Sequence, residues 1–434
     1  MASTLLLSRS SKQRRTGIGE RKAVLSGAIA LLLAFSVSAA QSAEARHRHH
    51  GSSSKHHHSL RHHLAGIGRH LLGRRHRGAH QHVAARIHHE IGMLVLTENG
   101  ETVVDKMSSN EFNPASVVKV ITAYGALSKF GPNHRFNTDI YMDGELDHET
   151  GILNGDLYLK GCDPDFEKQD AEAVARALKQ QGVKEIRGKL IVDPKFSYRS
   201  DPNPHNSAAS VARIFRSGNV ACRLPIDKGA AVGAVPENAE HIGQFESETL
   251  RETLKRVLSF SLNRVAEQIG RTIGGVDELE NIVSQEAGLA PGSLKLASAS
   301  GLGQSRVKPR DMMLILKSLR GKLQANGLDY QDIFPVAGID PGTLDERFTA
   351  PEERGSVVAK TGTLPGTDGG TSALAGMCSA QQENLYFVIF CWHGSVPAFR
   401  HQQDEIIRQL QARHGGPKPL EYRRVPGDQE VQLN

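Results

Sequence analysis

The stretch Gly355-Ser-Val-Val-Ala-Lys-Thr-Gly362 decides the fold, because it predicts a buried β-strand that ends at Lys360. Two further apolar runs follow it, Ser372 to Met377 and Leu385 to Cys391, and each has the length and composition of a strand. We expect these three segments to pair as an antiparallel sheet. The edge of such a sheet would present a lysine and several hydroxyl groups to a ligand.

A β-hairpin is predicted at the other end of the globular part. The apolar runs 91–96 and 102–105 flank Glu98-Asn-Gly100, and an Asn-Gly pair between two such runs is a strong hairpin signal. We expect this hairpin to begin the sheet that the C-terminal strands complete.

The middle of the chain divides into a helical part and a β-rich part. Helical patterns dominate residues 246–274 and 309–320, and Ser261 lies in an interruption of the first of them. Residues 136–242 instead contain short strands, Gly and Pro turns and one predicted helix, Asp170 to Gln181. This change in composition predicts an inserted β-rich subdomain, so we expect an α+β core, an antiparallel sheet flanked by helices, in two sequence pieces.

The N-terminus has the features of a signal peptide. Basic residues between Arg9 and Lys22 precede a fifteen-residue apolar stretch, 23–37, which is shorter than the roughly 20 residues that a membrane span needs. Small residues follow at Ser38-Ala-Ala40. We expect export to the periplasm with cleavage after Ala40; the alternative is that the segment stays as an anchor in the inner membrane.

The expected organisation follows from these patterns. It comprises a signal peptide (1–40), a disordered His/Arg-rich segment (41–89), a core in two pieces (90–135 and 243–412), the inserted subdomain (136–242) and a loose C-terminal tail (413–434).

Positive charge is concentrated before the globular part. Residues 1–90 carry 15 Lys and Arg against 3 Asp and Glu, whereas residues 91–434 carry 38 against 44. The net charge of +6 therefore belongs to the N-terminal segment. Because the globular part has no basic face and the chain has only 5% aromatic residues, we expect no nucleic acid partner.

Residues 46–89 hold fourteen of the 21 histidines, among many arginines. Such a segment buries almost no apolar surface, so we expect it to be disordered. Three interpretations stay open: a solvated spacer, adhesion to an anionic envelope polymer or membrane surface, and capture of divalent metal ions. No catalytic metal site is expected, because no pair of these histidines has a fixed scaffold.

Three short strings in a fixed order carry the expected chemistry: Ser116-Val-Val-Lys119, Ser261-Leu-Asn263 and Lys360-Thr-Gly362. In sites of this kind a serine attacks an amide carbonyl, a lysine moves its proton, and a cationic strand holds the carboxylate of the substrate. Each string alone has an ordinary structural explanation, as a surface pair on a helix, a helix cap or a lysine at a strand end. Their occurrence together and in order favours the catalytic interpretation.

The local sequence distinguishes Ser116 from other serines that have a lysine three positions later. Ser116 follows Asn113-Pro114 and opens an apolar run with helical spacing, so we expect its hydroxyl at a helix start with the lysine on the same face. Ser52 lies in a Ser/His tract without apolar periodicity. Ser305 is followed four residues later by a proline, which disfavours helix before it. We expect neither of these two serines to be the nucleophile.

With these motifs, the chain resembles the penicillin-binding proteins of class C type 4, the D-alanyl-D-alanine carboxypeptidases/endopeptidases of the S13 peptidase family. The resemblance covers roughly residues 90–400 and implies a core like that of the transpeptidases and serine β-lactamases. It is also carried by Phe112-Asn-Pro-Ala-Ser-Val-Val-Lys-Val-Ile-Thr-Ala, Leu153-Asn-Gly-Asp-Leu-Tyr-Leu-Lys-Gly-Cys-Asp-Pro, Ala299-Ser-Gly-Leu, Phe334-Pro-Val-Ala-Gly and Ala359-Lys-Thr-Gly-Thr-Leu. The 141 residues between Lys119 and Ser261 exceed the insert of a serine β-lactamase but are fewer than in the longer family members.

The expected mechanism gives three residues a catalytic role. Ser116 is the nucleophile. Lys119, desolvated and close to the cation Lys360, has a lowered pKa and accepts the serine proton. Ser261 relays this proton to the leaving amine.

The remaining site residues are expected to bind the substrate. By the resemblance, Thr363 and the nucleophile supply the backbone N–H groups that stabilise the oxyanion. Asn263 holds the peptide amide, and Lys360 with the hydroxyls of Thr361 and Thr363 binds the terminal carboxylate. Gly362 belongs to the same segment and completes this set.

We therefore expect a serine DD-peptidase that acts on peptidoglycan stem peptides through an acyl-enzyme on Ser116, is inhibited by β-lactam antibiotics, and needs no cofactor or metal. Two alternatives stay open. One is a serine β-lactamase-like hydrolase, which needs fast deacylation and usually lacks so large an insert. The other is a catalytically inactive wall-binding protein. Carboxypeptidase and endopeptidase activity are not distinguished, because both present a D-alanyl carbonyl to the same serine.

Four cysteines lie in a chain that we expect to meet an oxidising compartment. Cys378 and Cys391 fall on consecutive strands, and the hairpin register separates them by some five or six residues along the sheet, which is too far for a disulfide. If any pair forms, we expect Cys162 with Cys222, since both lie in the insert.

Overall fold

The computed structural model describes residues 5–8 and 90–422. Most of the predicted signal peptide, the His/Arg-rich segment and the last residues of the C-terminal tail lie outside the described residues. Within the described ranges, no helix is long and apolar enough to cross a membrane.

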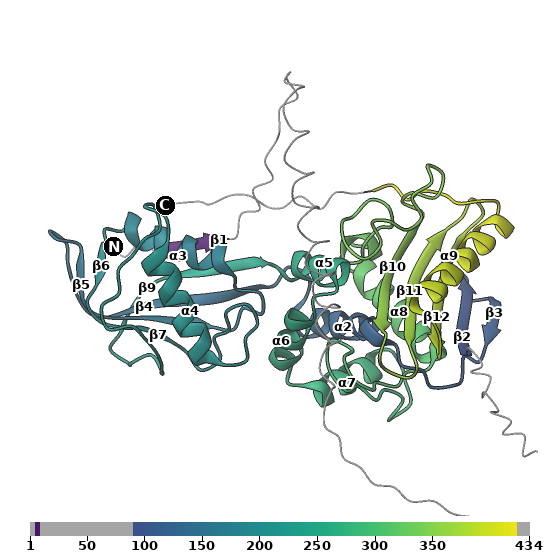
Figure 1. The fold of residues 1–434 in the computed structure, drawn as a ribbon, viewed down its shortest axis with the longest axis horizontal. Coiled ribbons are helices and arrows are strands. Elements are labelled where there is room, and N and C mark those ends of the chain that lie inside the picture. Colours follow the sequence, from purple (N-terminus) through teal and green to yellow (C-terminus); the bar gives the residue numbers. More distant parts are fainter. Residues whose placement is uncertain (1–4, 9–89, 423–434) are drawn as a thin grey trace, which may run out of the picture. The chain divides into compact units, whose positions relative to one another are not determined.

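The core contains a five-stranded antiparallel sheet in the order β10-β11-β12-β2-β3 (Figure 1). Its strands are β2 (Glu90–Thr97), β3 (Thr102–Lys106), β10 (Val357–Leu364), β11 (Thr371–Ser379) and β12 (Asn384–Trp392). The predicted hairpin and the three predicted C-terminal strands are therefore confirmed, and they form one sheet. β10 lies at its edge and continues four residues past Lys360, because Thr361 to Leu364 also pair with β11.

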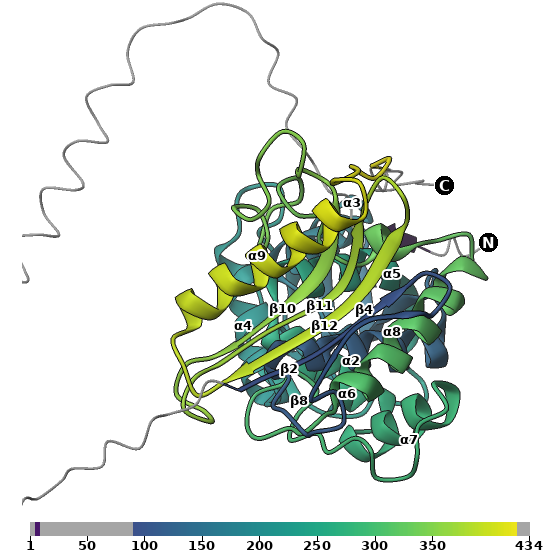
Figure 2. The ribbon, with the colours of Figure 1, turned by 90° about the vertical axis from the view of Figure 1, so that its right-hand side faces the viewer.

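Side chains of β10, β11 and β12 alternate between two buried faces, as the period of two in a strand requires, whereas β3 is partly exposed. One face packs against α9 (Val396–Arg413), which lies across β10, β11 and β12 (Figure 2). This face includes Val357, Leu374 and Phe387 together with Phe399 and Ile407 of the helix. The opposite face includes Val358, Ala375 and Val388. Because both faces of β10, β11 and β12 are buried, these three strands are mostly apolar.

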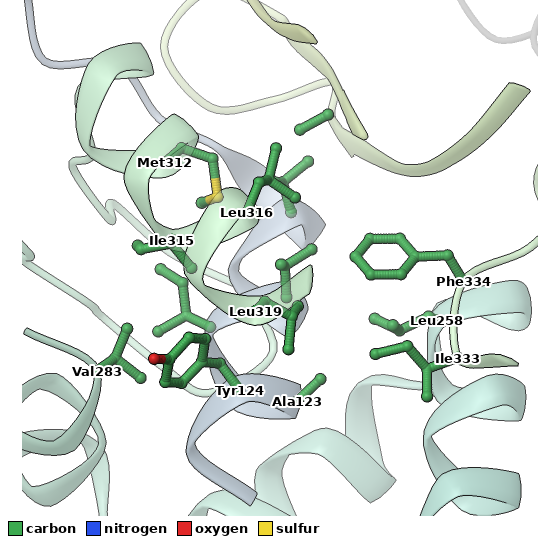
Figure 3. Close-up of a cluster of buried hydrophobic side chains, with 14 of the residues drawn as sticks. Ala123, Tyr124, Leu258, Val283, Met312, Ile315, Leu316, Leu319, Ile333 and Phe334 are labelled. Carbon is green, nitrogen blue, oxygen red and sulfur yellow. The ribbon is translucent and has the colours of Figure 1, made fainter. Parts of the chain in front are cut away.

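Helices from the middle of the chain cover the second face. α2 (Val118–Phe130) is buried over most of its length, and Tyr124 packs in the same cluster as Leu316 and Leu319 of α8 (Pro309–Gln324) (Figure 3). A helix surrounded on all sides needs apolar residues all round, which explains the sequence Val-Lys-Val-Ile-Thr-Ala at its start. The other helical elements are α5 (Leu250–Phe260), α6 (Asn263–Ile273), α7 (Val276–Glu286) and η2 (Tyr330–Asp332).

The predicted helical stretch 246–274 begins too early. Its first four residues belong to β9 (Glu240–Thr249), a strand that also crosses the expected end of the insert at residue 242. The helix α5 begins at Leu250 because Thr249 forms a capping box with Glu252: the Thr249 hydroxyl accepts from the Glu252 N–H, and the Glu252 carboxylate accepts from the Thr249 N–H.

The insert forms a second sheet with its own hydrophobic cluster. The strand order is β1-β9-β4-β5-β7-β8, and β6 also pairs with β5. The strands are β1 (Leu5–Ser8), β4 (Arg135–Asp147), β5 (Ile152–Gly161), β6 (Glu185–Ile186), β7 (Leu190–Val192), β8 (Ala230–Val232) and β9. β1, which pairs in parallel with β9, comes from the predicted signal peptide and was not expected in this sheet.

Two helices accompany this sheet, α3 (Lys168–Gln180) and α4 (Pro204–Ser217). Only the first of these helices was predicted from the sequence, so the expectation of one helix is wrong. α4 begins with Asn203 as N-cap, whose side chain accepts from the His205 N–H, and with proline at the first helical position.

All four cysteines are free. The register pairs Cys378 with Leu385 and Cys391 with Ser372, which confirms that these two thiols are out of register with each other. Cys162 and Cys222 do not form the conditionally expected disulfide.

The predicted fold class is confirmed. The chain has an α+β core, with an antiparallel sheet flanked by helices and formed from two sequence pieces, and a β-rich insert between them.

Candidate active site

Ser116 lies in a short turn immediately before a buried helix. The turn is η1 (Ala115–Val117), which leads directly into α2. Asn113 shapes it, since its side-chain oxygen accepts from the Ala115 N–H at 3.0 Å and Ala115 adopts a left-handed φ of 48°. Ala115 and Val117 are buried, whereas Ser116 is only half-buried. The hydroxyl of Ser116 is therefore accessible at a helix start, as predicted.

Two glycines allow other segments to approach this turn closely. A Cβ atom on Gly362 of β10 would lie 2.5 Å from the carbonyl oxygen of Pro114. A Cβ atom on Gly301, whose φ is 82°, would lie 2.0 Å from the carbonyl oxygen of Ala115. Both distances are shorter than the closest approach of a non-bonded carbon and oxygen atom, so neither position accommodates a side chain. Gly362, predicted only as a substrate-binding residue, thus has a packing role beside the turn that carries Ser116.

Lys119 is fully buried and contacts three oxygen atoms. Its Nζ atom donates to Ser116 Oγ at 2.9 Å, to Asn263 Oδ1 at 2.7 Å and to the carbonyl oxygen of Ser300 at 2.7 Å. An ammonium group donates to all three. A neutral amine would still donate to the amide and carbonyl oxygens, and its lone pair would then accept from the serine hydroxyl. The geometry therefore suits proton transfer from Ser116 to Lys119.

Burial lowers the pKa of Lys119 to about 7, and the nearby Glu267 carboxylate opposes this change. Glu267 also accepts from the Ser300 N–H at 2.9 Å, and Ser300 is the residue whose carbonyl oxygen Lys119 contacts. Burial lowers the pKa of Lys360 well below its usual value, and the charge of Lys119 acts in the same direction. The predicted lowering of the Lys119 pKa therefore arises first from burial.

Ser261 and Asn263 lie at the junction of α5 and α6. Ser261 ends α5 in a left-handed conformation, with a φ of 56°, and Asn263 begins α6. This break in the helix turns the Asn263 side chain to Lys119. Within the part of the chain that the structure describes, the Ser261 hydroxyl has no hydrogen-bond partner and is half-buried. Its predicted relay role stays a prediction.

The edge strand β10 brings Lys360, Thr361 and Thr363 to the same region. Lys360 is fully buried, and its Nζ atom donates to the carbonyl oxygen of Thr361 at 2.8 Å. Thr361 is buried and Thr363 is half-buried. The Thr363 hydroxyl accepts from Nη2 of Arg400 at 3.1 Å. Thr363 is therefore the more accessible of the two threonine hydroxyls.

The turn that carries Ser116 is also tied to two loops. The Asn113 Nδ2 atom donates to Asp368 Oδ2 at 2.9 Å and to the carbonyl oxygen of Gly303 at 3.0 Å. Asp368 in turn forms an ion pair with Arg306 at 2.8 Å. These contacts fix the loops after β10 and after Gly301 against the same turn.

The serines expected to be uninvolved differ from Ser116 in burial or placement. Ser305 is fully buried, and its hydroxyl accepts from the Ala297 N–H at 3.0 Å. Helix α8 begins only at Pro309, so Ser305 is not at a helix start, as predicted. Ser52 lies outside the described residues.

Comparison with protein families decides the assignment. The chain matches the D-Ala-D-Ala carboxypeptidase 3 (S13) family over residues 81–218 and 223–412. It belongs to the S13 family. This S13 peptidase is therefore an enzyme, a serine hydrolase, as the motifs predicted.

Curated relatives and solved structures agree with this assignment. The S13 peptidase is 29% identical to the D-alanyl-D-alanine carboxypeptidase DacB of Haemophilus influenzae, over 69% of this chain and 85% of the relative. It is 23% identical to the D-alanyl-D-alanine carboxypeptidase of Actinomadura sp. strain R39, over 77% and 84%. Its fold is similar to that of Bd3459, a predatory peptidoglycan endopeptidase of Bdellovibrio bacteriovorus, with a TM-score of 0.65 and 19% identity over 77% of this chain and 95% of the other.

Four residues of the S13 peptidase site were missed by the sequence analysis as functional candidates: Asn113, Glu267, Ser300 and Arg400. Ser300 belongs to Ala299-Ser-Gly-Leu, which was noted as a signature but given no role. Glu267 lies one helical turn after Asn263, a spacing that places both side chains on the same face of a helix. That spacing was the available signal for it.

The pKa of Lys119 predicts how acylation depends on pH. We expect the neutral amine to accept the Ser116 proton, so the rate constant for acylation by penicillin should rise with pH through about 7 and level off above it. In Glu267→Gln the amide oxygen can still accept from the Ser300 N–H, but the charge that favours the ammonium is lost. The pH range in which the acylation rate rises should then move to lower values. The measurement is the acylation rate by stopped flow between pH 5.5 and 9.

Glu280→Gln is a matched control, because Glu280 also accepts from a backbone N–H, that of Leu296, but does not contact Lys119. Its profile should coincide with that of the unmodified protein. A profile without a limb near pH 7, or one that moves to higher pH in Glu267→Gln, contradicts the assignment of Lys119 as the base.

Proposed function

We propose that the protein is a serine DD-peptidase that cleaves the amide after a D-alanine in peptidoglycan stem peptides through an acyl-enzyme on Ser116. The observation that carries this proposal is the 2.9 Å contact between Ser116 Oγ and a buried lysine whose pKa is about 7. A serine hydroxyl becomes a useful nucleophile only when an adjacent group takes its proton. Lys119 meets this need near neutral pH.

In the proposed reaction, Ser116 Oγ attacks the D-alanyl carbonyl carbon while its proton passes to Nζ of Lys119. The carbonyl oxygen becomes an oxyanion, stabilised by the backbone N–H groups of Ser116 and Thr363. The proton then passes through Ser261 to the leaving amine as the amide bond breaks. Water hydrolyses the resulting ester and restores the serine.

Substrate contacts follow from groups that remain available. The side-chain oxygen of Asn263 is engaged by Lys119, which leaves its NH₂ group to donate to a carbonyl of the peptide. The Thr361 and Thr363 hydroxyls, on the strand of Lys360, lie where the terminal carboxylate of the substrate would bind. These roles agree with the activity of the two relatives described above, which are D-alanyl-D-alanine carboxypeptidases.

β-Lactams are proposed as inhibitors on the same basis. The Bd3459 endopeptidase has been solved in a form acylated by penicillin G. The penicillin-binding protein 4 of H. influenzae, solved in complex with a β-lactam, is similar to this chain with a TM-score of 0.60 and 20% identity. We expect a long-lived penicillin adduct here; rapid hydrolysis of the drug would indicate a β-lactamase instead.

Mass analysis of muropeptides tests the proposed function. Cross-linked peptidoglycan is digested with the purified protein, and the soluble fragments are compared with those from Ser116→Ala. Loss of one terminal D-alanine from pentapeptides indicates carboxypeptidase activity, and conversion of dimers to monomers indicates endopeptidase activity. If neither change occurs although the protein is folded, the proposed function is wrong.

We also propose that the chain is exported to the periplasm and that the His/Arg-rich segment adheres to an anionic envelope surface. Export is supported by the N-terminal sequence, in which basic residues are followed by an apolar stretch and then by small residues. Adhesion is supported by the fourteen histidines in residues 46–89. Unperturbed histidines titrate near pH 6.5, so retention on anionic vesicles should strengthen from pH 7.5 to 5.5. Retention on the vesicles that depends on neither pH nor salt contradicts the proposed adhesion of the His/Arg-rich segment.

A further inference from the structure

Arg400 is an exposed cation beside the proposed carboxylate site. It lies in the N-terminal part of α9, and its Nη2 atom donates to Thr363 Oγ1 at 3.1 Å. The strand that carries Thr363 is at the edge of the sheet. Arg400 therefore reaches the hydroxyl that is most accessible on this edge, although the two residues are 37 positions apart in the sequence.

The helix that carries Arg400 is anchored to the strand next to Thr363. Phe399 is buried in the cluster between α9 and the sheet. Gln403, which is fully buried, donates through Nε2 to Ser372 Oγ at 3.2 Å, and Ser372 is the residue that pairs with Thr363 across β10 and β11. The contacts of Phe399 and Gln403 thus fix the backbone of Arg400 at a set distance from Thr363.

A cation strengthens the hydrogen bonds to a carboxylate, and the two lysines of the site are poorly placed to supply it. Lys119 and Lys360 are fully buried, and burial lowers the pKa of both. The Nζ atom of Lys360 also points to a carbonyl oxygen of its own strand. A guanidinium, in contrast, keeps its charge at any ordinary pH and is weakly hydrated.

The charge of Arg400 is not neutralised by a carboxylate among the described residues. Asp404, one turn further along α9, forms its ion pair with Arg347. Arg400 takes part in no ion pair of the described segments, and Thr363 is its only hydrogen-bond partner there. A guanidinium has five N–H donors, so a second group can bind alongside the threonine hydroxyl.

We propose that Arg400 is a specificity-determining residue that binds, together with the Thr363 hydroxyl, the free carboxylate that follows the scissile amide of the substrate. This proposal rests on the proposed function and adds one residue to its substrate contacts: Arg400 favours peptides and β-lactams that carry an anionic carboxylate at that position. A substrate with a neutral carboxamide there offers no charge to the guanidinium and should be selected against.

The test compares two soluble substrates that differ in one group. Both are acyl-D-Ala-D-Ala peptides, one with a free terminal carboxylate and the other with a terminal carboxamide. Arg400→Gln should lower kcat/KM for the carboxylate peptide roughly 10- to 100-fold, as expected for a hydrogen bond to a charged group, and change it for the carboxamide peptide by about twofold at most. Arg400→Lys should lie between, because it keeps the charge but loses the planar fork.

Arg413→Gln, an exposed arginine near the end of the same helix, is the matched control and should leave the ratio of the two kcat/KM values unchanged. If the unmodified protein cleaves neither peptide, the proposed function itself fails. If it cleaves the carboxylate peptide and Arg400→Gln leaves the ratio unchanged, the inference is wrong. An equal loss on both peptides also overturns it, because a displaced helix would not distinguish the two terminal groups.

Discussion

Ser116→Ala is expected to form no covalent adduct with labelled penicillin, whereas the unmodified protein forms one adduct per chain. The substitution removes the oxygen atom that we propose attacks the carbonyl, while the turn around it is held by Asn113 and the glycines and should stay intact. Labelling is measured by intact-protein mass, and the adduct is located by peptide mapping. Hydrolysis of a soluble D-Ala-D-Ala peptide should fall below detection in the same variant.

Ser305→Ala provides a comparison from the second Ser-x-x-Lys string of the globular part. Its buried hydroxyl only accepts from a backbone N–H, so labelling should persist in this variant even if its stability falls. An adduct that survives in Ser116→Ala, or one that maps to the peptide containing Ser305, contradicts the assignment of the nucleophile.

Lys119→Arg should lower the acylation rate by about 10²- to 10⁴-fold, the range expected when a general base is lost. Arginine keeps the positive charge and nearly the length, but a guanidinium stays protonated and cannot accept the Ser116 proton. The measurement is the second-order rate constant for penicillin acylation across the pH range. The residual rate should no longer rise through pH 7.

Lys129→Arg is the control on the same helix, because Lys129 contacts only the carbonyl oxygen of Ile273 among the described residues. It should acylate normally. Near-normal acylation in Lys119→Arg would mean that Lys119 acts only through its charge, and the proposed mechanism would then need another base.

Local patterns were enough to predict the sheet and the helix that bears Ser116. The strands around Lys360, the Asn-Gly hairpin and the turn before Ser116 all depend on neighbours within a few residues. Family resemblance then placed three strings in one site, and the structure brings Lys119 to both Ser116 and Asn263. Their roles still depend on the experiments above.

Contacts between distant segments could not be predicted in the same way. Ser300 and Lys119 are 181 residues apart, and Arg400 reaches Thr363 only because α9 packs across the sheet. The missed helix α4 and the late start of α5 are different, because Asn203-Pro204 and the pair Thr249 and Glu252 are local start signals that a closer analysis of the sequence would have used.

Burial of Lys119 beside Ser116 lowers the stability of the fold while it lowers the pKa of the amine. The pKa of Lys119 is 10.5 in the unfolded chain and about 7 in the folded protein. Between these two pH values the unfolded chain binds more protons than the folded protein does. The free energy of unfolding therefore rises as the pH rises from about 7 to 10.5. At about 1.36 kcal/mol per unit, the ammonium lowers the free energy of unfolding by on the order of 5 kcal/mol below pH 7. The cores around α2 must supply that amount. An apolar side chain at this position would remove the cost of burying a charge, but it would also remove the proton acceptor that we propose for Ser116 and the donor to Asn263 and Ser300.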